Sequence, residues 1–466
     1  MNMKHQGSRH RTLLRATQIA AASAAFALLA ACGGGSGGNN NASTPPPSGV
    51  NMQVVAFGTS LSDAGTYSEQ ILPGFGGGRF TTNPGEVWAQ HVSEYFGNTL
   101  SPAFEGGFGL PLTATGGLDY AQGGALVTGG GVANTSAVIA AASEQPVTWQ
   151  LQQYLAQHGS FNSNQLVLVE GGANEILDLL NVPTDGTPTG LALFGAALAA
   201  TPFSTLVNDP ATQQSTVASL MQSGFTQAQA TALVPAAIAL GLVTNPSYAS
   251  TFSSIAPVLT AAGTLSALVH ADIVPGNPKI ALVTVPDIGK TPAALKADAA
   301  IGATPGSSTS ADVALSLISA MYNLTLIKAS AADVQAKKVV LVDTFSWLDQ
   351  SIANAASLGF TVTNTDTACN LTAMTNSATN YALANPQATL GLNPATTPQA
   401  TINAYAAAYG QNFGSSLFCS PQTLTTANAP TTYMFADLVH PTTALHSQFA
   451  AYVETQLAAA GIGKAP

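Results

Sequence analysis

The amino-acid sequence predicts a parallel α/β fold with helices on both faces of the sheet. Five short apolar segments rich in β-branched residues are separated by longer Ala-, Leu- and Gln-rich stretches with helical spacing. Three of the apolar segments run directly into clusters of turn-forming residues, GTSLSDAG, GGANE and PDIGKTP. Strands that alternate with helices form doubly wound parallel sheets, and such sheets bind ligands just beyond the carboxyl ends of their strands.

The predicted strands and the longest predicted helices follow one another along the chain. A continuous apolar run bounded by turn residues is typical of a strand that is buried on both faces. Spaced apolar residues in a longer stretch indicate an amphipathic helix. The strands are expected at 53–57, 118–121, 165–170, 279–285 and 338–343, and the helices at 85–96, 147–158, 311–328 and 444–459.

The stretch from about residue 181 to residue 272 interrupts this alternation. It is rich in Ala and Leu, carries several Pro and Gly residues, and shows no strand pattern. We expect a set of short helices that packs beside the sheet as an insertion. Two roles remain open for it: shaping an apolar acyl pocket at the binding site, or structural cover alone.

The N-terminus predicts export. Lys4 and three arginines precede an Ala/Leu-rich segment that is too short to span a bilayer comfortably, so residues 1–31 have the pattern of a secretory signal peptide. The segment ends in LLAAC, which resembles the bacterial lipoprotein signal and implies lipidation of Cys32. The alternative is an ordinary signal peptide with a chance cysteine. Gly33 in place of Asp implies, by the same resemblance, an outer-membrane lipoprotein attached through its N-terminal lipid.

The mature chain is expected to begin with a flexible tether and to be acidic. Residues 32–50 are rich in Gly, Ser, Asn and Pro and cannot build a core, so the folded domain is expected over 51–463. Four of the 12 basic residues leave with the signal peptide, and 8 remain against 22 acidic residues. The absence of a basic stretch argues against nucleic acid as a partner and fits a neutral or apolar substrate.

Two cysteines, Cys369 and Cys419, remain after Cys32. An even pair in an oxidising compartment most simply forms a disulfide, and two unpaired buried thiols are the alternative. No Cys/His spacing in the sequence indicates a zinc site, and no metal is expected.

The residues that could carry chemistry are few. Ser60 lies in the turn after the first predicted strand, where a serine is a candidate nucleophile. Five histidines remain in the mature chain, and one of them is the expected general base. His440 stands out because Asp437, three residues before it, can hydrogen-bond the imidazole and fix its tautomer. A surface loop with an unrelated Asp and His is the alternative.

An acyl-transfer site also needs hydrogen-bond donors for an oxyanion. Gly124, in YAQGGA, offers a backbone N–H that a substrate can approach closely, and Asn174, in GGANE, offers a side-chain amide after a predicted strand. Double glycines also mark tight turns, and an asparagine after a strand often caps a helix. Each residue taken alone therefore leaves both interpretations open.

Taken together, these residues resemble the SGNH, or GDSL, hydrolase family. FGTSLSDAG is similar to the family's first block, DYAQGGA to the second, GGANE to the third and DLVHP to the last, so the resemblance covers most of the chain from residue 53 onward. Thr59 departs from the pattern, because the residue before the nucleophile is usually Asp. Glu175 is a conservative departure from the Asp that usually follows the asparagine.

The resemblance implies a flavodoxin-like α/β/α sandwich with a five-stranded parallel sheet and a hydrolase of carboxylic esters. Ser60 would attack the ester carbonyl, His440 would act as base and then as acid, and Asp437 would orient His440. The backbone N–H groups of Ser60 and Gly124 and the side chain of Asn174 would form the oxyanion hole. No metal or organic cofactor would be needed.

The sequence thus predicts an extracytoplasmic GDSL esterase or lipase that cleaves neutral acyl esters through a Ser-His-Asp triad and an acyl-enzyme. A polysaccharide O-acetylesterase of the same fold is the alternative within this chemistry. A surface-binding lipoprotein with a catalytically weakened site is the alternative outside it, and Thr59 is the only feature of the sequence that points to it.

Overall fold

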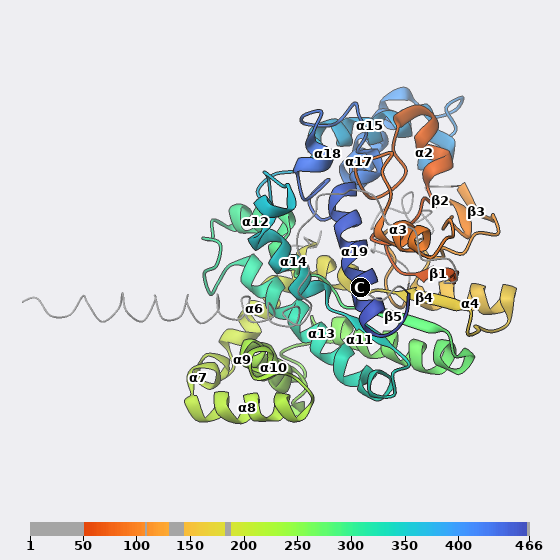
Figure 1. Ribbon diagram of the computed structural model, residues 1–466. Coiled ribbons are helices and arrows are strands. Elements are labelled where there is room, and N and C mark those ends of the chain that lie inside the picture. The colour runs from red at the N-terminus through yellow and green to blue at the C-terminus, as the bar shows by residue number, and fades with distance from the viewer. Residues whose placement is uncertain (1–50, 108–109, 130–143, 182–187, 464–466) are drawn as a thin grey trace, which may run out of the picture.

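The computed structural model describes residues 51–107, 110–129, 144–181 and 188–463 (Figure 1). The predicted signal peptide, the Cys32 lipidation site and the tether lie outside the described residues. Within the described part, the chain is an α/β protein built around one parallel sheet.

The sheet has four parallel strands in the order β1-β4-β5-β6. Val55 of β1 is opposite Val167 of β4, Val167 is opposite Ile280 of β5, and Leu282 of β5 is opposite Leu341 of β6. The strands are nearly all apolar because helices cover both faces of the sheet. Their bounds are Gln53–Phe57 for β1, Gln165–Val169 for β4, Lys279–Val283 for β5 and Val340–Val342 for β6.

The prediction of a fifth strand at 118–121 is wrong for the described chain. This segment lies beside β1, but only Asp119 forms isolated bridges, one to Ala56 and one to Pro102. Glycines precede and follow the segment, and the Asp119 carboxylate accepts the N–H of Ala121 at 3.1 Å, so the chain turns away after one bridge. A two-stranded hairpin of β2 (Phe104–Gly107) and β3 (Leu110–Ala114) was not expected from the sequence.

Helices cover the two faces of the sheet and give three layers (Figure 1). Val55 and Val167 point to one face and Val54 and Leu166 to the other, as the two-residue period of a strand requires. The first face packs against α4 (Val147–His158), α11 (Ala256–Leu268) and α13 (Ala311–Gln335), and the second against α3 (Trp88–Tyr95) and α19 (Thr443–Ala459).

The described residues of the insertion, 188–272, are helical and contain no strand, as expected. They pack on α13 and on the apolar cluster that contains Val55 and Val167. Helix α11 with its extension to Gly276 and helix α13 are long and apolar enough to cross a membrane, but about half of each lies buried in this core. The other helices here are α6 (Gly190–Ala199), α7 (Phe203–Asn208), α8 (Pro210–Gln222), α9 (Gln227–Ala232) and α10 (Val234–Val243).

A second helical group with its own apolar cluster lies toward the C-terminus. Tyr381 and Tyr409 are buried in it, and Cys369 and Cys419 are joined there in the expected disulfide, with Cα atoms 5.6 Å apart. The group contains α2 (Ser68–Phe75), α15 (Leu371–Ala384), α16 (Pro386–Leu390) and α17 (Gln399–Phe413). The connecting helices are α5 (Ala173–Leu177), α12 (Pro292–Ile301), α14 (Thr344–Ala353) and α18 (Ala429–Thr432).

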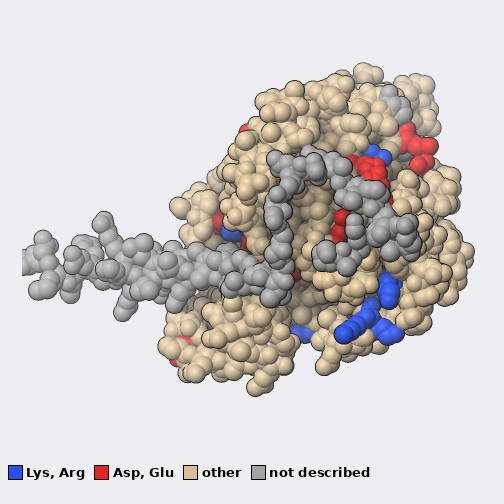
Figure 2. Space-filling view, viewed as in Figure 1, with Lys and Arg blue, Asp and Glu red and all other residues tan. Residues whose placement is uncertain are grey.

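Charged side chains are sparse on the surface. Only 7% of the residues are Asp, Glu, Lys or Arg. Figure 2 shows one face on which most atoms belong to uncharged residues, and the basic side chains there form only small groups. This face offers no broad basic surface of the kind that binds nucleic acid.

Candidate active site

Ser60 lies in a tight turn at the carboxyl end of β1. The backbone N–H groups of Ser62 and Asp63 both donate to the Thr59 carbonyl, at 3.1 and 3.2 Å, which closes the turn. Gly58 is required where the strand ends, because a Cβ atom there would lie 2.2 Å from the Glu170 carboxyl group. The Ser60 side chain lines a pocket at this edge of the sheet.

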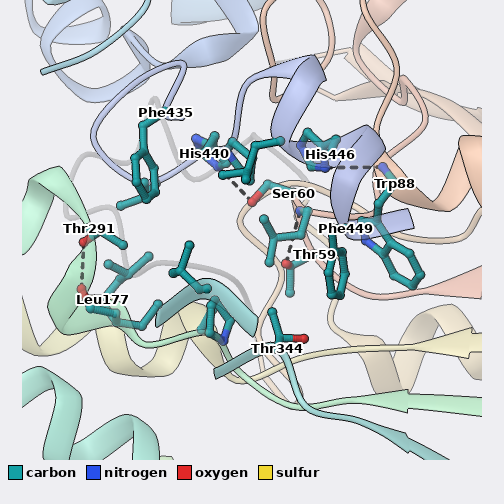
Figure 3. Close-up of a pocket in the computed structure, with 18 of the residues that line it drawn as sticks. Thr59, Ser60, Trp88, Leu177, Thr291, Thr344, Phe435, His440, His446 and Phe449 are labelled. Atoms are coloured by element: carbon teal, nitrogen blue, oxygen red, sulfur yellow. Dashed lines mark hydrogen bonds between the residues drawn. The ribbon is translucent and has the colours of Figure 1, made fainter. Parts of the chain in front are cut away.

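The structure brings the three predicted catalytic residues into one chain of hydrogen bonds. His440 Nε2 lies 2.9 Å from Ser60 Oγ, and His440 Nδ1 lies 2.7 Å from Asp437 Oδ2 (Figure 3). His440 and Asp437 come from the loop before α19, where the Ala436 N–H donates to the His440 carbonyl at 2.7 Å. The loop is therefore bent so that both side chains reach the end of β1.

Asp437 is held as a carboxylate. Burial alone would raise the pKa of Asp437, but the charge of His440 and hydrogen bonds from the His440 side chain and the backbone lower it to about 2. Its Oδ1 atom accepts the N–H groups of Val439 and His440, at 2.9 and 2.8 Å. A carboxylate in this place keeps the proton on His440 Nδ1 and leaves Nε2 able to accept the Ser60 proton.

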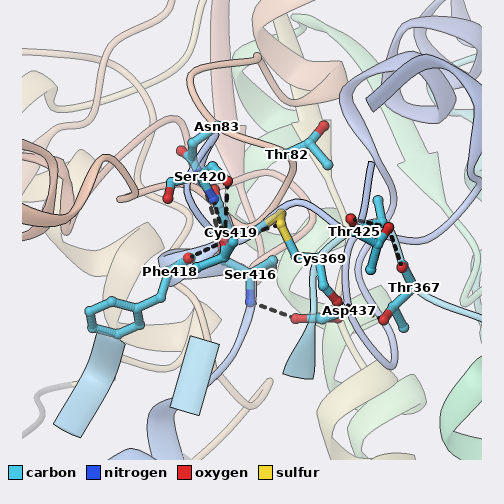
Figure 4. Close-up of a disulfide and its surroundings, with 12 residues drawn as sticks. Thr82, Asn83, Thr367, Cys369, Ser416, Phe418, Cys419, Ser420, Thr425 and Asp437 are labelled. Atoms are coloured by element: carbon cyan, nitrogen blue, oxygen red, sulfur yellow. Dashed lines mark hydrogen bonds between the residues drawn. A yellow bond between two sulfur atoms is a disulfide. The ribbon is translucent and has the colours of Figure 1, made fainter. Parts of the chain in front are cut away.

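A fourth partner of Asp437 comes from the disulfide region and was not predicted. The Ser416 backbone N–H donates to Asp437 Oδ2 at 2.7 Å (Figure 4). Cys419 follows three residues later, and the Cys369 N–H donates to the Ala436 carbonyl at 3.0 Å. The disulfide thus ties together the two segments that flank the Asp437 carboxylate.

Aromatic packing holds the His440 ring on its other side. The rings of Phe80 and His440 have centroids 5.0 Å apart. Phe80 occupies the space that a Cβ atom on Gly123 would need, at 2.0 Å from its ring atoms. The Gly123–Gly124 turn therefore packs against His440 through Phe80.

The predicted oxyanion donors are available for a substrate. Among the described residues, the backbone N–H groups of Ser60 and Gly124 donate to no acceptor. Asn174 Nδ2 donates to the Ala125 carbonyl at 2.8 Å, which orients the amide and leaves its second N–H free. Asn174 lines the same pocket as Ser60, and Gly124 has a φ of +80°, which favours glycine.

Asp63 joins the nucleophile turn to the glycine turn, and sequence reasoning missed it. Its Oδ2 atom accepts the Gly123 N–H at 3.0 Å, and its Oδ1 atom accepts the N–H groups of Gly65 and Thr66 at 2.9 and 2.7 Å. Burial raises the pKa of Asp63, and these N–H groups oppose the rise. Asp63 could have been predicted from its position in SLSDAG, three residues after Ser60.

The pocket around Ser60 is mainly apolar on both sides. Figure 3 shows Ser60 and His440 between Trp88 and Phe449 on one side and Leu177 and Phe435 on the other. None of the described insertion residues, 188–272, lines this pocket. Of the two roles that the sequence left open for the insertion, shaping the pocket around Ser60 gains no support from these residues. The further apolar lining consists of Leu61, Pro286, Ile288, Trp347, Leu348, Val439, Pro441 and Leu445.

His446 also lines the pocket but does not serve as a base. Its Nδ1 atom accepts the Trp88 N–H at 3.3 Å. Burial, with smaller contributions from other histidines, lowers the pKa of His446 to about 3, so the ring is neutral at physiological pH and a poor proton acceptor. Of the pocket histidines, only His440 contacts Ser60.

One group of side chains outside the pocket has the donor types of a cation site. The ligand atoms of Glu86, His91 and Glu94 lie within 4.8 Å of one another. His91 Nδ1 is 3.7 Å from Glu86 and 3.6 Å from Glu94, so ion pairing of a protonated histidine also explains the arrangement. None of the three lines the pocket.

Comparisons with protein-family models and with curated proteins found no match to this chain.

Proposed function

We propose that the protein is a serine hydrolase of carboxylic esters of the SGNH type. The observation that carries this proposal is the chain of hydrogen bonds from Ser60 through His440 to Asp437, at 2.9 and 2.7 Å. A serine is a weak nucleophile unless a base takes its proton, and a base needs a third group to fix its tautomer.

The proposed reaction has two halves. Ser60 Oγ attacks the ester carbonyl carbon while its proton passes to His440 Nε2. The carbonyl oxygen becomes negative and accepts hydrogen bonds from the N–H groups of Ser60, Gly124 and Asn174. The tetrahedral species collapses, the C–O bond to the alcohol breaks, and His440 returns the proton to the leaving oxygen. A water molecule then attacks the acyl-enzyme in the same way and releases the acid. These steps use no metal or organic cofactor.

The order of the sheet segments supports the flavodoxin-like assignment. The segment 118–121 lies beside β1, although it is too short for a strand, and β4, β5 and β6 follow on the other side. When the five segments are numbered in chain order, they lie side by side across the sheet in the order 2-1-3-4-5, which is the flavodoxin-like arrangement. Ser60 follows β1 and Asn174 follows β4, at the point where such sheets bind ligands.

The lining of the pocket favours an ester with an apolar acyl chain. Aliphatic and aromatic side chains flank Ser60 on both sides, and few charged groups reach the pocket. A polysaccharide O-acetylesterase, the second candidate, would need hydroxyl-binding polar groups around the nucleophile, and the lining offers only a few. Delivery to the outer membrane as a lipoprotein remains a prediction of the first 33 residues.

Hydrolysis of p-nitrophenyl esters from acetate to palmitate by the full-length chain tests this proposal. We expect the highest kcat/KM for an acyl chain longer than acetate and a loss of at least about 10³-fold in Ser60→Ala. Ser215→Ala, a change at an exposed hydroxyl of α8, is the matched control and should leave the rate unchanged. A fluorophosphonate should label the wild type and not Ser60→Ala. Equal turnover by wild type and Ser60→Ala would disprove the proposal.

A further inference from the structure

A buried glutamate lies directly under the nucleophile turn. Glu170 follows β4 and is 4% exposed. Its Oε1 atom accepts the Thr59 backbone N–H and, at 3.1 Å, the Ser62 hydroxyl. Its Oε2 atom is 3.1 Å from Thr59 Oγ1. One carboxyl group therefore contacts the residue before Ser60 and the residue two positions after it.

The turn is shaped to admit this carboxyl group. A side chain on Gly58 would collide with Glu170, as described above. On its other side, the Gln150 amide of α4 accepts the Gly58 N–H at 2.9 Å and donates to the Gly58 carbonyl at 2.8 Å. The turn therefore takes its position from two side chains of neighbouring elements as well as from its own backbone.

Thr59 and Glu170 complement each other. An aspartate at position 59, which the SGNH resemblance leads us to expect, would place a second carboxyl group against the buried one of Glu170. Two carboxylates at hydrogen-bond distance in a buried site cannot both be ionised without a large cost. Threonine avoids this cost, and its hydroxyl can accept from or donate to the Glu170 carboxyl group.

We propose that Glu170 is the positioning residue for the Ser60 nucleophile. Its carboxyl group, which follows the neighbouring strand β4, takes the place of the aspartate expected before the serine. A carboxyl group in this place requires an uncharged residue such as threonine at position 59. This inference rests on the proposed hydrolase function. It also explains why the absence of Asp at position 59 need not weaken the site.

The protonation of Glu170 fits this role. Burial raises the pKa of Glu170 to about 7, against the hydrogen bonds from Thr59 and Ser62, and Glu175 adds to the rise. The other titratable groups that interact with it are Asp119 and Tyr322, so no cation among the described residues is seen to act on the carboxyl group. In the neutral form the Oε2–H can donate to Thr59 Oγ1 while Oε1 still accepts the Thr59 N–H, which a glutamine amide would reproduce.

Four variants of the full-length chain test the proposal: Glu170→Gln, Glu170→Ala, Thr59→Asp and the double variant Thr59→Asp/Glu170→Gln. We expect Glu170→Gln to keep kcat within about threefold of wild type, because the amide keeps the same hydrogen bonds. Glu170→Ala should lower kcat by roughly 10- to 100-fold with little change in KM, since Ser60 moves while the pocket remains. Thr59→Asp should also lower kcat, and the added Glu170→Gln change should restore most of it.

The outcomes separate this inference from the proposed function. A wild type that hydrolyses esters together with a Glu170→Ala variant of unchanged kcat would overturn the inference alone, as would a Thr59→Asp variant that Glu170→Gln does not rescue. If the wild type shows no Ser60-dependent turnover, the hydrolase proposal fails. Amide hydrogen exchange over residues 58–63 then decides: exchange that is faster in Glu170→Ala than in Glu170→Gln supports positioning, and equal exchange contradicts it.

Discussion

The Asp437 carboxylate has hydrogen-bond partners on both of its oxygens, and these partners come from two segments that are distant in sequence. His440 Nδ1 and the Ser416 N–H share Oδ2, while the Val439 and His440 N–H groups share Oδ1. An amide in its place would present an N–H group to some of these donors and leave His440 in the wrong tautomer.

Asp437→Asn is therefore expected to lower kcat by roughly 10³- to 10⁴-fold with KM nearly unchanged. Ester hydrolysis at pH 7 measures this, with Asp366→Asn at an exposed position as the control. The pKa of Asp437 is lowered to about 2, so the stability from its ionised form is present above the ordinary value of 3.8 and is lost as the pH falls toward 2. The variant should lack this part of the acid transition. A variant with wild-type kcat would contradict the assignment of Asp437.

Gly124 is expected to matter for catalysis and not only for the turn. An alanine there would combine a φ of +80° with a Cβ atom 2.6 Å from the Glu144 carboxyl group. Gly116→Ala is a matched control, because its φ is +84° and no atom lies within 4 Å of the added Cβ. The positive φ should cost each variant about 1–2 kcal/mol of unfolding free energy, and the close approach to Glu144 should add to the loss in Gly124→Ala. Only Gly124→Ala should lose kcat, by about tenfold or more, and equal kcat in both would contradict a role in the oxyanion hole.

At the scale of elements, the carboxyl ends of β1 and β4 carry the proposed nucleophile, Ser60, and the proposed amide donor, Asn174. An acidic pair also joins α14 to the segment after β5. Asp349 of α14 interacts with Asp287, which follows β5. Burial and then the charge of Asp287 raise the pKa of Asp349, and Lys290 opposes the rise. The pair therefore keeps a proton in the folded protein that the unfolded chain releases near pH 4.

Because the pKa of Asp349 is raised in the folded state, stability should fall as the pH rises above the ordinary value of 3.8. Asp349→Asn cannot ionise, so its melting temperature should fall less than that of the wild type between pH 5 and pH 8. Thermal unfolding followed by circular dichroism measures the difference, and Asp366→Asn should follow the wild type. Parallel curves for Asp349→Asn and wild type would show that Asp349 is ionised in the folded state.

The sequence predicted elements best where burial dictates a simple pattern. Strands β1, β4, β5 and β6 were found because both faces are covered, which demands an unbroken apolar run. The segment at 118–121, LDYA, is shorter and carries a charged residue, and its Asp119 side chain and its flanking glycines end the pairing. Composition does not reveal where a short strand stops.

Part of the candidate site could also be predicted from the sequence and part could not. The contacts among Ser60, His440 and Asp437 could be predicted from the residue types and from the three-residue spacing of the last two. Glu170 and Gln150 could not, because their partners lie 111 and 92 residues away in sequence and no local pattern marks the contact. The sequence left open whether the insertion shapes the apolar pocket, and the fold builds this pocket from elements that precede and follow the described insertion residues.

At the scale of the whole molecule, the disulfide links the C-terminal helical group to the catalytic loop. It closes a loop of 50 residues, which is worth about 4 kcal/mol in the chain-entropy model. Cys369→Ser/Cys419→Ser should lower the melting temperature by several degrees and should also lower kcat, because Ser416 no longer holds Asp437 as firmly. Thermal unfolding and ester hydrolysis below the melting temperature measure the two effects. A variant with lower stability and unchanged kcat would show that the disulfide does not support the site.

The position of this disulfide has a consequence for when the protein acquires its activity. A newly made chain in a reducing compartment would have the Ser-His-Asp residues but not the covalent brace beside Asp437. On the proposed function, the reduced chain would therefore hydrolyse esters more slowly than the oxidised chain. The redox state of the compartment would then set the activity of the proposed hydrolase as well as the stability of its fold.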